Sequence, residues 1–217
     1  MKSSAADIAP FAGFSPEAFA FFGKLARNNE REWFQARKET FEKVCKQPFE
    51  ALAWALDPKE GATFMTRIYR DVRFAKDKSP YRTDISGMVG GHYLQISAKG
   101  LYVGVGLYMP EPPALRKLRE AIAADGSGRA LVGIVERLRA KGYEVVSHES
   151  VTSAPRGYEA GHPRIEFLRM KDIHAGITRP PADLATAKAV ERIRRDEAEL
   201  APFRQWLLEH VGKTSCG

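Results

Sequence analysis

The residues best suited to chemistry lie in one stretch, RIYRDVRFAKDKSPYRT, which spans residues 67–83. It holds four arginines, two lysines and only two acids, interleaved with isoleucine, valine, phenylalanine and two tyrosines. A solvated basic tail would lack these apolar residues, and a buried strand could not hold so many unpaired cations. Because the planar guanidinium of arginine binds phosphate or carboxylate in a bidentate way, the composition predicts either an anion site or an internal network of ion pairs.

The spacing of the arginines assigns them different roles. Alternate residues of a strand point to opposite faces, so Arg70 lies opposite Arg67 and Arg73 and has apolar neighbours. One adjacent acid, Asp71, cannot neutralise three arginines, and distant glutamates or an anionic ligand must complete the balance. We therefore expect Arg70 to be structural, whereas Arg73, nearer the following loop, is expected to contact a ligand.

The loop after this strand adds groups that could transfer a proton. Lys78 lies three residues before Tyr81, and a nearby ammonium stabilises a phenolate, so Tyr81 could donate or accept a proton. The candidate catalytic residues are Tyr81, Lys78 and Asp71. The candidate ligand-binding residues are Arg67, Arg70, Arg73, Lys76 and His92. These residues leave the reaction and any cofactor open.

The sequence lacks the common motifs for metal and nucleotide sites. No two of the five histidines are three or four residues apart and there is no Cys-x-x-Cys, so we predict no metal site. One alternative stays open, in which His92 and His174 converge with an aspartate around a metal ion. Gly104 and Gly106 lie in a predicted strand with no helix after it, which excludes a dinucleotide fingerprint. Glycines in such a strand admit a ligand or another backbone.

The composition is that of a globular protein with a focused positive charge. The formal net charge is +7 and the pI is near 9.4, which raises the expectation of an anionic partner. No segment has the apolar length of a signal peptide or a membrane span, so we expect no membrane partner. Cys45 lies in a helical pattern and Cys216 near the C-terminus, which does not suggest a disulfide framework. We therefore expect a cytoplasmic location.

Around the basic stretch, the pattern of apolar residues predicts helices first, strands in the middle and helices last. The expected helices cover 15–29, 30–47, 48–57, 112–124, 128–141 and 183–212, the last broken at Pro202. The expected strands cover 62–74, 92–98, 101–108, 143–147 and 164–171, with the pair at 92–108 forming a hairpin beside the first strand. We predict a single α+β domain, residues 11–211, with a mostly antiparallel sheet, a flexible start at 1–10 and a flexible tail at 212–217.

The basic stretch and its surroundings resemble a bacterial and fungal family called domain of unknown function 2461. The resemblance extends from about Phe11 to Leu207 and includes NNEREWF, GHYLQIS, GLYVGVGLYMPEP, APRGY and HPRIEFLRMKD. Its central motif comprises Arg67, Arg70, Asp71, Arg73, Phe74, Asp77, Lys78 and Tyr81. The resemblance supports the choice of site residues and implies no particular reaction.

Three functional hypotheses follow from the sequence. We favour a pocket for a small anionic ligand bearing phosphate or carboxylate, on which the protein could also act as an enzyme. The second hypothesis is nucleic-acid binding by the same stretch, with Tyr69 and Tyr81 available for base stacking. The third is a partner-binding module in which every arginine of the stretch has a protein acid as its partner.

Overall fold

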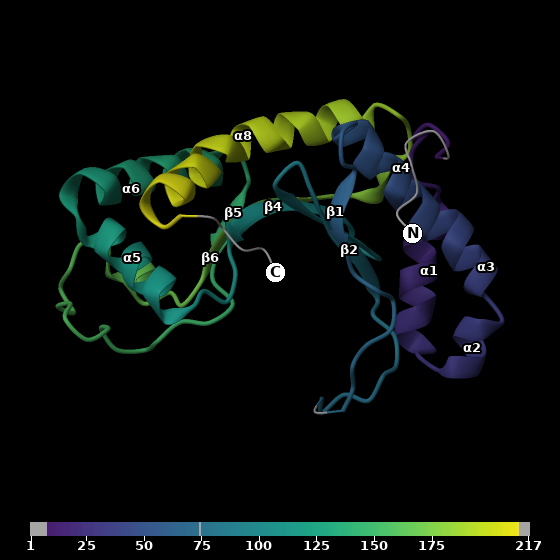
Figure 1. Ribbon diagram of the computed structural model, residues 1–217, viewed down its shortest axis with the longest axis horizontal. Helices are drawn as coiled ribbons and strands as arrows, with labels where there is room; N and C mark the ends of the chain where they lie inside the picture. The colour runs from purple at the N-terminus through teal and green to yellow at the C-terminus, as the bar shows by residue number, and fades with distance from the viewer. Residues whose placement is uncertain (1–7, 74, 213–217) are drawn as a thin grey trace. The chain divides into compact units, whose positions relative to one another are not determined.

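A computed structural model describes residues 8–73 and 75–212 of the chain. Phe74 of the central motif, Cys216 and most of the two predicted flexible ends lie outside the described residues. Six strands form one sheet in the order β1-β2-β3-β4-β6-β5, and helices occupy both ends of the chain (Figure 1). The strands are β1 (Ala62–Met65), β2 (Asp84–Val89), β3 (His92–Ser97), β4 (Gly100–Leu107), β5 (Glu144–Val146) and β6 (Ile173–Arg179). The predicted α+β class with an antiparallel sheet is confirmed.

The chain divides into two compact units. The first unit contains the described residues up to Val103 together with Thr178–Arg195, and the second contains Gly104–Ile177 and the described residues from Asp196 onward. No helix within residues 8–73 and 75–212 is long and apolar enough to cross a membrane.

The first unit packs its N-terminal helices against β1, β2 and β3 (Figure 1). The helical elements are α1 (Pro16–Arg27), α2 (Arg31–Gln35), α3 (Lys38–Phe41), a π-helical turn (Glu42–Lys46) and α4 (Gln47–Leu56). The predicted boundary at residue 47 is wrong, because α3, the π-helical turn and α4 follow one another without a break. Pro48 lacks the N–H that an α-helix needs, and the wider turn just before it accommodates that gap. Buried phenylalanines fill the interface: Phe19, Phe21, Phe22, Phe34, Phe41 and Phe49.

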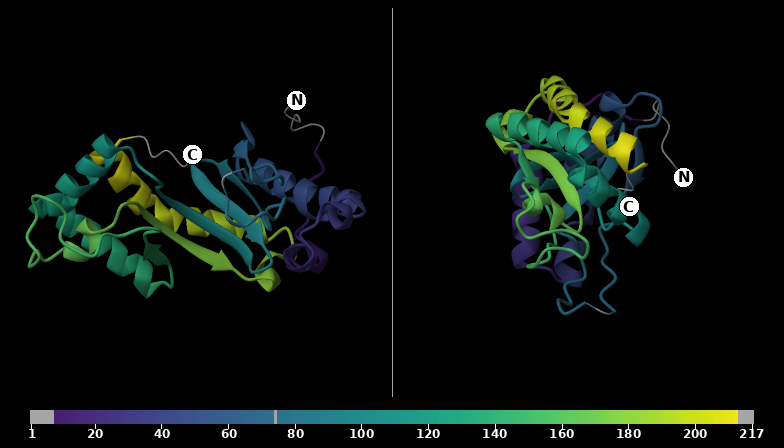
Figure 2. Two further views of the ribbon diagram at one scale, coloured as in Figure 1. Left: turned by 90° about the horizontal axis from the view of Figure 1, so that it is seen from below. Right: turned by 90° about the vertical axis from the view of Figure 1, so that its left-hand side faces the viewer.

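Residues 66–83 leave the sheet as a two-legged extension that we call the basic arm. The predicted strand at 62–74 is therefore too long, since β1 ends at Met65. Two backbone hydrogen bonds join the legs, from Arg70 N to Pro80 O at 2.9 Å and from Arg82 N to Ile68 O at 2.8 Å. Figures 1 and 2 show the arm extending beyond β1 and β2. Charged residues at nearly every second position cannot be buried on both faces of a sheet, which explains why strand pairing with β2 stops.

The strand β2 was not predicted, and it changes the neighbours of the hairpin. The antiparallel pairing runs from Asp84 opposite Ser97 to Val89 opposite His92, so β2 lies between β1 and the predicted hairpin. Gly87 interrupts the apolar pattern of β2, and its absent side chain lets the β1 backbone approach. A β-carbon at Gly87 would lie 2.6 Å from Phe64 O.

The second unit contains α5 (Pro112–Ala123), α6 (Asp125–Ala140), β5, a short α7 (Ile165–Leu168) and most of α8 (Ala189–His210). The predicted strand at 164–171 is wrong: α7 occupies its middle, and the strand of this region is β6. Arg164 explains the turn, because its buried side chain donates to Ile122 O at 2.6 Å and Ala123 O at 2.7 Å. The break expected at Pro202 is also absent, since α8 continues through it and buries the neighbouring Phe203.

Candidate functional site

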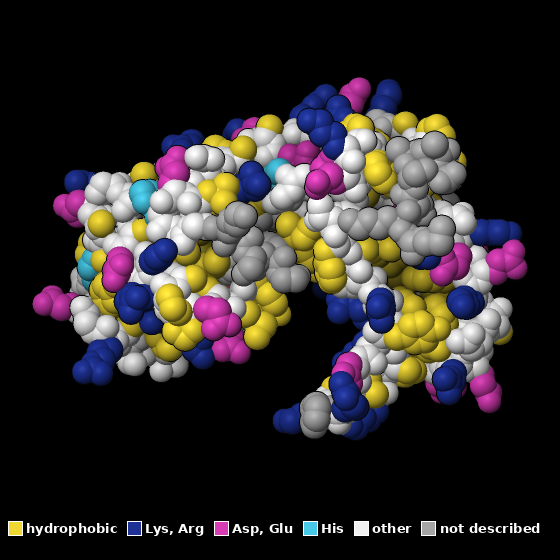
Figure 3. All heavy atoms as spheres, in the orientation of Figure 1, with side chains coloured by type: hydrophobic (Ala, Val, Ile, Leu, Met, Phe, Trp, Pro, Cys, Tyr) yellow, Lys and Arg dark blue, Asp and Glu magenta, His cyan; other side chains and the backbone are white. Residues whose placement is uncertain are grey.

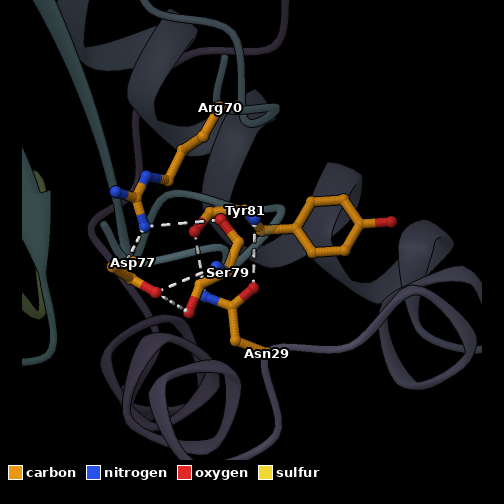
Figure 4. A network of polar contacts seen from close by, with 5 residues as sticks. All are labelled: Asn29, Arg70, Asp77, Ser79 and Tyr81. Atoms are coloured by element: carbon orange, nitrogen blue, oxygen red, sulfur yellow. Dashed lines mark hydrogen bonds and ion pairs between the residues drawn. The ribbon is translucent and has the colours of Figure 1, made fainter. Parts of the chain in front are cut away.

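The base of the basic arm is fixed to the turn between α1 and α2. Asn29 Nδ2 donates to Tyr81 O at 2.9 Å, and Tyr81 N donates to Asn29 Oδ1 at 3.0 Å (Figure 4). The Tyr81 ring is 1% exposed and stacks on Phe34 with ring centroids 4.1 Å apart. The pair of hydrogen bonds and the aromatic stack together make Tyr81, at the base of the returning leg, part of the core.

The two residues predicted to transfer a proton serve different contacts. Lys78 Nζ donates to Val72 O at 3.0 Å and to Arg73 O at 3.4 Å, which closes the tip of the arm. The Tyr81 hydroxyl accepts a hydrogen bond from Gln35 Nε2 at 3.5 Å, and its ring points away from Arg70 (Figure 4). No hydrogen bond joins Lys78 to Tyr81 within the described residues, so the arm does not assemble them as a proton-transfer pair.

The exposure of the side chains alternates along the first leg of the arm, as predicted for the two faces of a strand. Arg67, Asp71 and Arg73 are exposed, whereas Arg70 is half-buried. The side chain of Arg73 is 76% exposed and that of Arg70 is 29% exposed. The two arginines therefore face different surroundings, as the two-residue period requires.

Arg70 belongs to a polar network inside the arm (Figure 4). Its guanidinium forms an ion pair with Asp77 and donates to Ser79 O at 3.3 Å. Asp77 Oδ1 also accepts from the Ser79 hydroxyl at 2.6 Å and the Ser79 N–H at 2.9 Å. These Ser79 donors, and then the Arg70 guanidinium, hold the pKa of Asp77 well below its usual range. Asp77, which the site prediction left out, is the acid that neutralises Arg70.

Arg73 has its ion pair at the surface. Its guanidinium contacts Asp71 Oδ2 at 2.6 Å, and both side chains are mostly exposed. The side-chain hydrogen bond from Arg73 lowers the pKa of Asp71. Exposed ion pairs of this kind contribute little to stability.

Arg67 has no ion pair or side-chain hydrogen bond with another described residue, and it lines a groove where the arm meets the sheet. The groove has a volume of about 450 Å³. Its lining consists of Phe64, Met65, Thr66, Arg67, Tyr69, Arg70, Asp71 and Arg82. Three of these lining residues are arginines, and Asp71 is the acid among them. Arg82 also forms an ion pair with Asp84 at 2.8 Å. A second hollow of about 310 Å³ shares Arg70 and Arg82 with it and includes Asp77 and Ser79.

Figure 3 shows the lysine and arginine side chains gathered on the arm, below the apolar surface of its base. Lys76 belongs to the arm and is exposed. Arg82 was counted in the basic stretch but was not predicted as a site residue. Its place in the sequence could have identified it, because a chain that turns back before Pro80 brings Arg82 beside the residues around Arg67.

His92 lies away from the groove within the first unit. It begins β3 opposite Val89, at the far end of β2 from the arm. At ~3.4 Å per residue, the six residues of β2 place its two ends roughly 17 Å apart. The side chain is buried, so His92 is not among the residues that line the groove.

The residues that could hold a metal lie in the second unit. His148, Asp172 and His174 offer ligand atoms within 4.8 Å of one another, and His92 is not part of this group. Burial, followed by the neighbouring His148, lowers the pKa of His174, which favours the neutral imidazole that metals bind. The open alternative had brought His174 together with His92, whereas among the described residues the imidazole beside His174 is that of His148.

Comparison with protein families agrees with the motif in the basic arm. Residues 17–206 match the family model described as "Conserved hypothetical protein (DUF2461)". The chain belongs to this family. The predicted resemblance to DUF2461 is therefore confirmed over nearly the whole described chain. No curated protein and no solved structure gives a significant match.

Proposed function

We propose that this member of DUF2461 binds a small anion bearing phosphate or carboxylate in the groove between the basic arm and the sheet. Arg67 is the main contact and Arg82, which also lines the groove, is the second. Arg73 does not line the groove and adds positive charge beside it through its partner Asp71. Arg70 stays in its network with Asp77 and shapes the wall. Tyr69, which is 53% exposed, provides an apolar edge for the uncharged part of the ligand.

The unpaired state of Arg67 carries this proposal. Every other arginine of the arm has an aspartate within ion-pair distance among the described residues, whereas Arg67 has none and lines a groove of ligand size. A guanidinium held beside two others gains most from an anion, because binding relieves their mutual repulsion and supplies a bidentate partner. An internal network alone would be expected to give Arg67 an acid among the residues that the structure describes.

The proposal is tested by titrating the protein with phosphate, sulfate and succinate in a calorimeter. We expect saturable binding of one anion per chain, and Arg67→Ala should weaken it by about 10- to 100-fold, as expected for loss of ~1.5–3 kcal/mol from a hydrogen bond to a charged group. Arg195→Ala is the matched control, since Arg195 is an 80% exposed arginine of α8 in the same unit that pairs with Glu191. Equal binding by Arg67→Ala and wild type would contradict the proposal.

Nucleic-acid binding gives a different result in the same variants. A single-stranded oligonucleotide would contact the whole arm, so binding would fall steeply with salt and would weaken similarly for Arg67→Ala, Arg73→Ala and Lys76→Ala. Such a result, without saturable binding of a small anion, would replace the proposed ligand with nucleic acid.

A further inference from the structure

The second unit holds a group of three potential metal ligands that strand pairing brings together. The antiparallel register of β5 and β6 sets Val146 opposite His174. Continuing this register by two residues places His148 beside Asp172, just before β6. The pairing thus gathers two imidazoles and one carboxylate from segments 24 residues apart.

The carboxylate of Asp172 is fixed at the centre of this group. Its side chain is 4% exposed, and Oδ1 accepts a hydrogen bond from His148 N at 2.8 Å. Oδ2 lies 3.5 Å from His148 Nδ1, and Oδ1 lies 3.9 Å from His174 Nδ1. Ligand atoms about 2.0–2.1 Å from a tetrahedral ion are roughly 3.3 Å apart, so small side-chain rotations suffice to close the site.

The two histidines are arranged as metal ligands would be, and not as two protonated partners of one carboxylate. Their rings stack with centroids 4.3 Å apart, a distance at which two imidazolium charges would repel strongly. His174 Nδ1 is buried and has no hydrogen-bond partner within the part of the chain that the structure describes. The buried carboxylate of Asp172 faces both imidazole rings, and a cation between them would satisfy all three groups.

We propose that His148, Asp172 and His174 bind one divalent transition-metal ion, with Zn²⁺ as the expected ion. Two imidazoles and one carboxylate suit such ions and are a poor set for Mg²⁺ or Ca²⁺, which prefer oxygen ligands. Three protein ligands leave a coordination position for water or substrate, which is the pattern of a catalytic rather than a structural zinc site. The proposal does not rest on the anion site, because all its residues belong to the second unit.

The surface around the site supports access by a ligand. The side chain of His148 is 55% exposed, and the ring of Tyr108 meets it edge-on at 5.1 Å. Three exposed residues with large apolar side chains are Tyr108, its chain neighbour Met109, and Val146, which lies opposite His174 in the β5–β6 register. Met109 has a backbone φ of 43°. A positive φ at a residue other than glycine costs free energy, and such strain occurs often at functional sites. Exposed apolar side chains at this rim can contact the apolar part of a substrate.

The test uses the full chain after removal of bound metal with a chelator. Zn²⁺ titration by calorimetry should show one ion per chain, and Co²⁺ should give the visible absorption bands of a four- or five-coordinate nitrogen and oxygen site. His148→Ala and Asp172→Asn should each weaken Zn²⁺ binding by at least ~10- to 100-fold, because even the loss of an outer partner has an effect of that size. His148 is largely exposed, so its variant keeps the test valid if Asp172→Asn fails to fold.

His210→Ala is the matched control, since His210 is an exposed histidine of α8 in the same unit. We expect it to bind Zn²⁺ as wild type does. Absence of one-to-one binding by the wild-type chain would overturn the proposal, and so would His148→Ala binding Zn²⁺ as tightly as His210→Ala. Binding of several ions with micromolar or weaker affinity, unchanged in every variant, would also overturn it by indicating adventitious surface sites.

Discussion

Asn29 and Tyr81 form a reciprocal pair of hydrogen bonds in which the side-chain amide of Asn29 acts like a peptide group. The amide donates to the Tyr81 carbonyl at 2.9 Å and accepts the Tyr81 N–H at 3.0 Å. This contact spans 52 residues of sequence and joins the turn after α1 to the returning leg of the basic arm. Together with the stack of the Tyr81 ring on Phe34, this pair fixes the base of the arm to the N-terminal helices.

Asn29→Ala should loosen the arm and lower the free energy of unfolding by about 1–3 kcal/mol, since two hydrogen bonds of ~0.5–1.5 kcal/mol each are lost. Hydrogen exchange of the amides at 68–82 should become faster. Asn28→Ala is the control, because Asn28 is exposed and its side-chain amide donates to Lys24 O at the end of the same helix, away from the arm. If both variants exchange these amides at the wild-type rate, the arm is held by the Phe34–Tyr81 stack instead.

Arg70 and Arg73 should respond differently to removal. Arg70→Ala strands Asp77 and removes a donor to Ser79 O, so we expect the unfolding temperature to fall by roughly 2–4 °C. Arg73→Ala removes an exposed ion pair with Asp71 and should leave the unfolding temperature nearly unchanged, while phosphate should stabilise the variant less than it stabilises the wild-type chain. Thermal unfolding with and without phosphate measures both effects. An equal loss of stability in the two variants, insensitive to phosphate, would contradict the division of roles.

The arm also shows what local pattern can and cannot predict. The two-residue alternation correctly separated Arg70 from Arg67 and Arg73, because exposure follows the pleat even where strand pairing is sparse. The partner of Arg70 was not predictable from the strand period, since Asp77 reaches it only through the turn at the tip. The anchoring of Tyr81 depends on Asn29 and Phe34, which are distant in sequence, and local spacing carries no signal for such contacts.

Cys45 should be chemically inert in the folded protein and should make stability fall at alkaline pH. Burial raises the pKa of its thiol far above the ordinary value of 9.0, and the thiol donates to Ala18 O at 3.6 Å. The unfolded chain ionises this thiol near its ordinary value while the folded chain does not, so the stabilising contribution is complete below about pH 9 and is lost as the pH rises further. Urea unfolding at about pH 8 and about pH 10 should show a smaller loss in Cys45→Ala than in wild type. A loss of the same size in both proteins would show that Cys45 does not cause it.

The sequence predicted the second unit less well, because the strand that pairs with β5 was placed at 164–171 instead of at Ile173–Arg179. RIEFLRMK has apolar residues that fit either a short helix or a strand, and the contacts of Arg164 with the end of α5 decide for a helix. Once β6 is placed at Ile173–Arg179, the register with β5 brings His148 to Asp172. The histidine spacing rules that predicted no metal site apply to ligands on one helix, and they do not detect ligands that meet across two strands.

Gly106 connects the fold of this unit to the proposed metal site. A β-carbon at Gly106 would lie 2.4 Å from the β-carbon of His174 and 2.6 Å from Ile173 O, so any side chain must push β6 away from β4. Gly106→Ala should lower the free energy of unfolding by roughly 1–3 kcal/mol and weaken Zn²⁺ binding, and Gly106→Val should do both more strongly.

Gly133→Ala is the control, since Gly133 lies in α6 and its added carbon would meet only Arg137 at 3.6 Å. We expect that control to be neutral or more stable by up to about 1 kcal/mol, because alanine favours a helix over glycine. Urea unfolding and Zn²⁺ titration of the two alanine variants measure the difference, and a Gly106→Ala protein with wild-type stability and zinc affinity would show that β6 can move without disturbing His174.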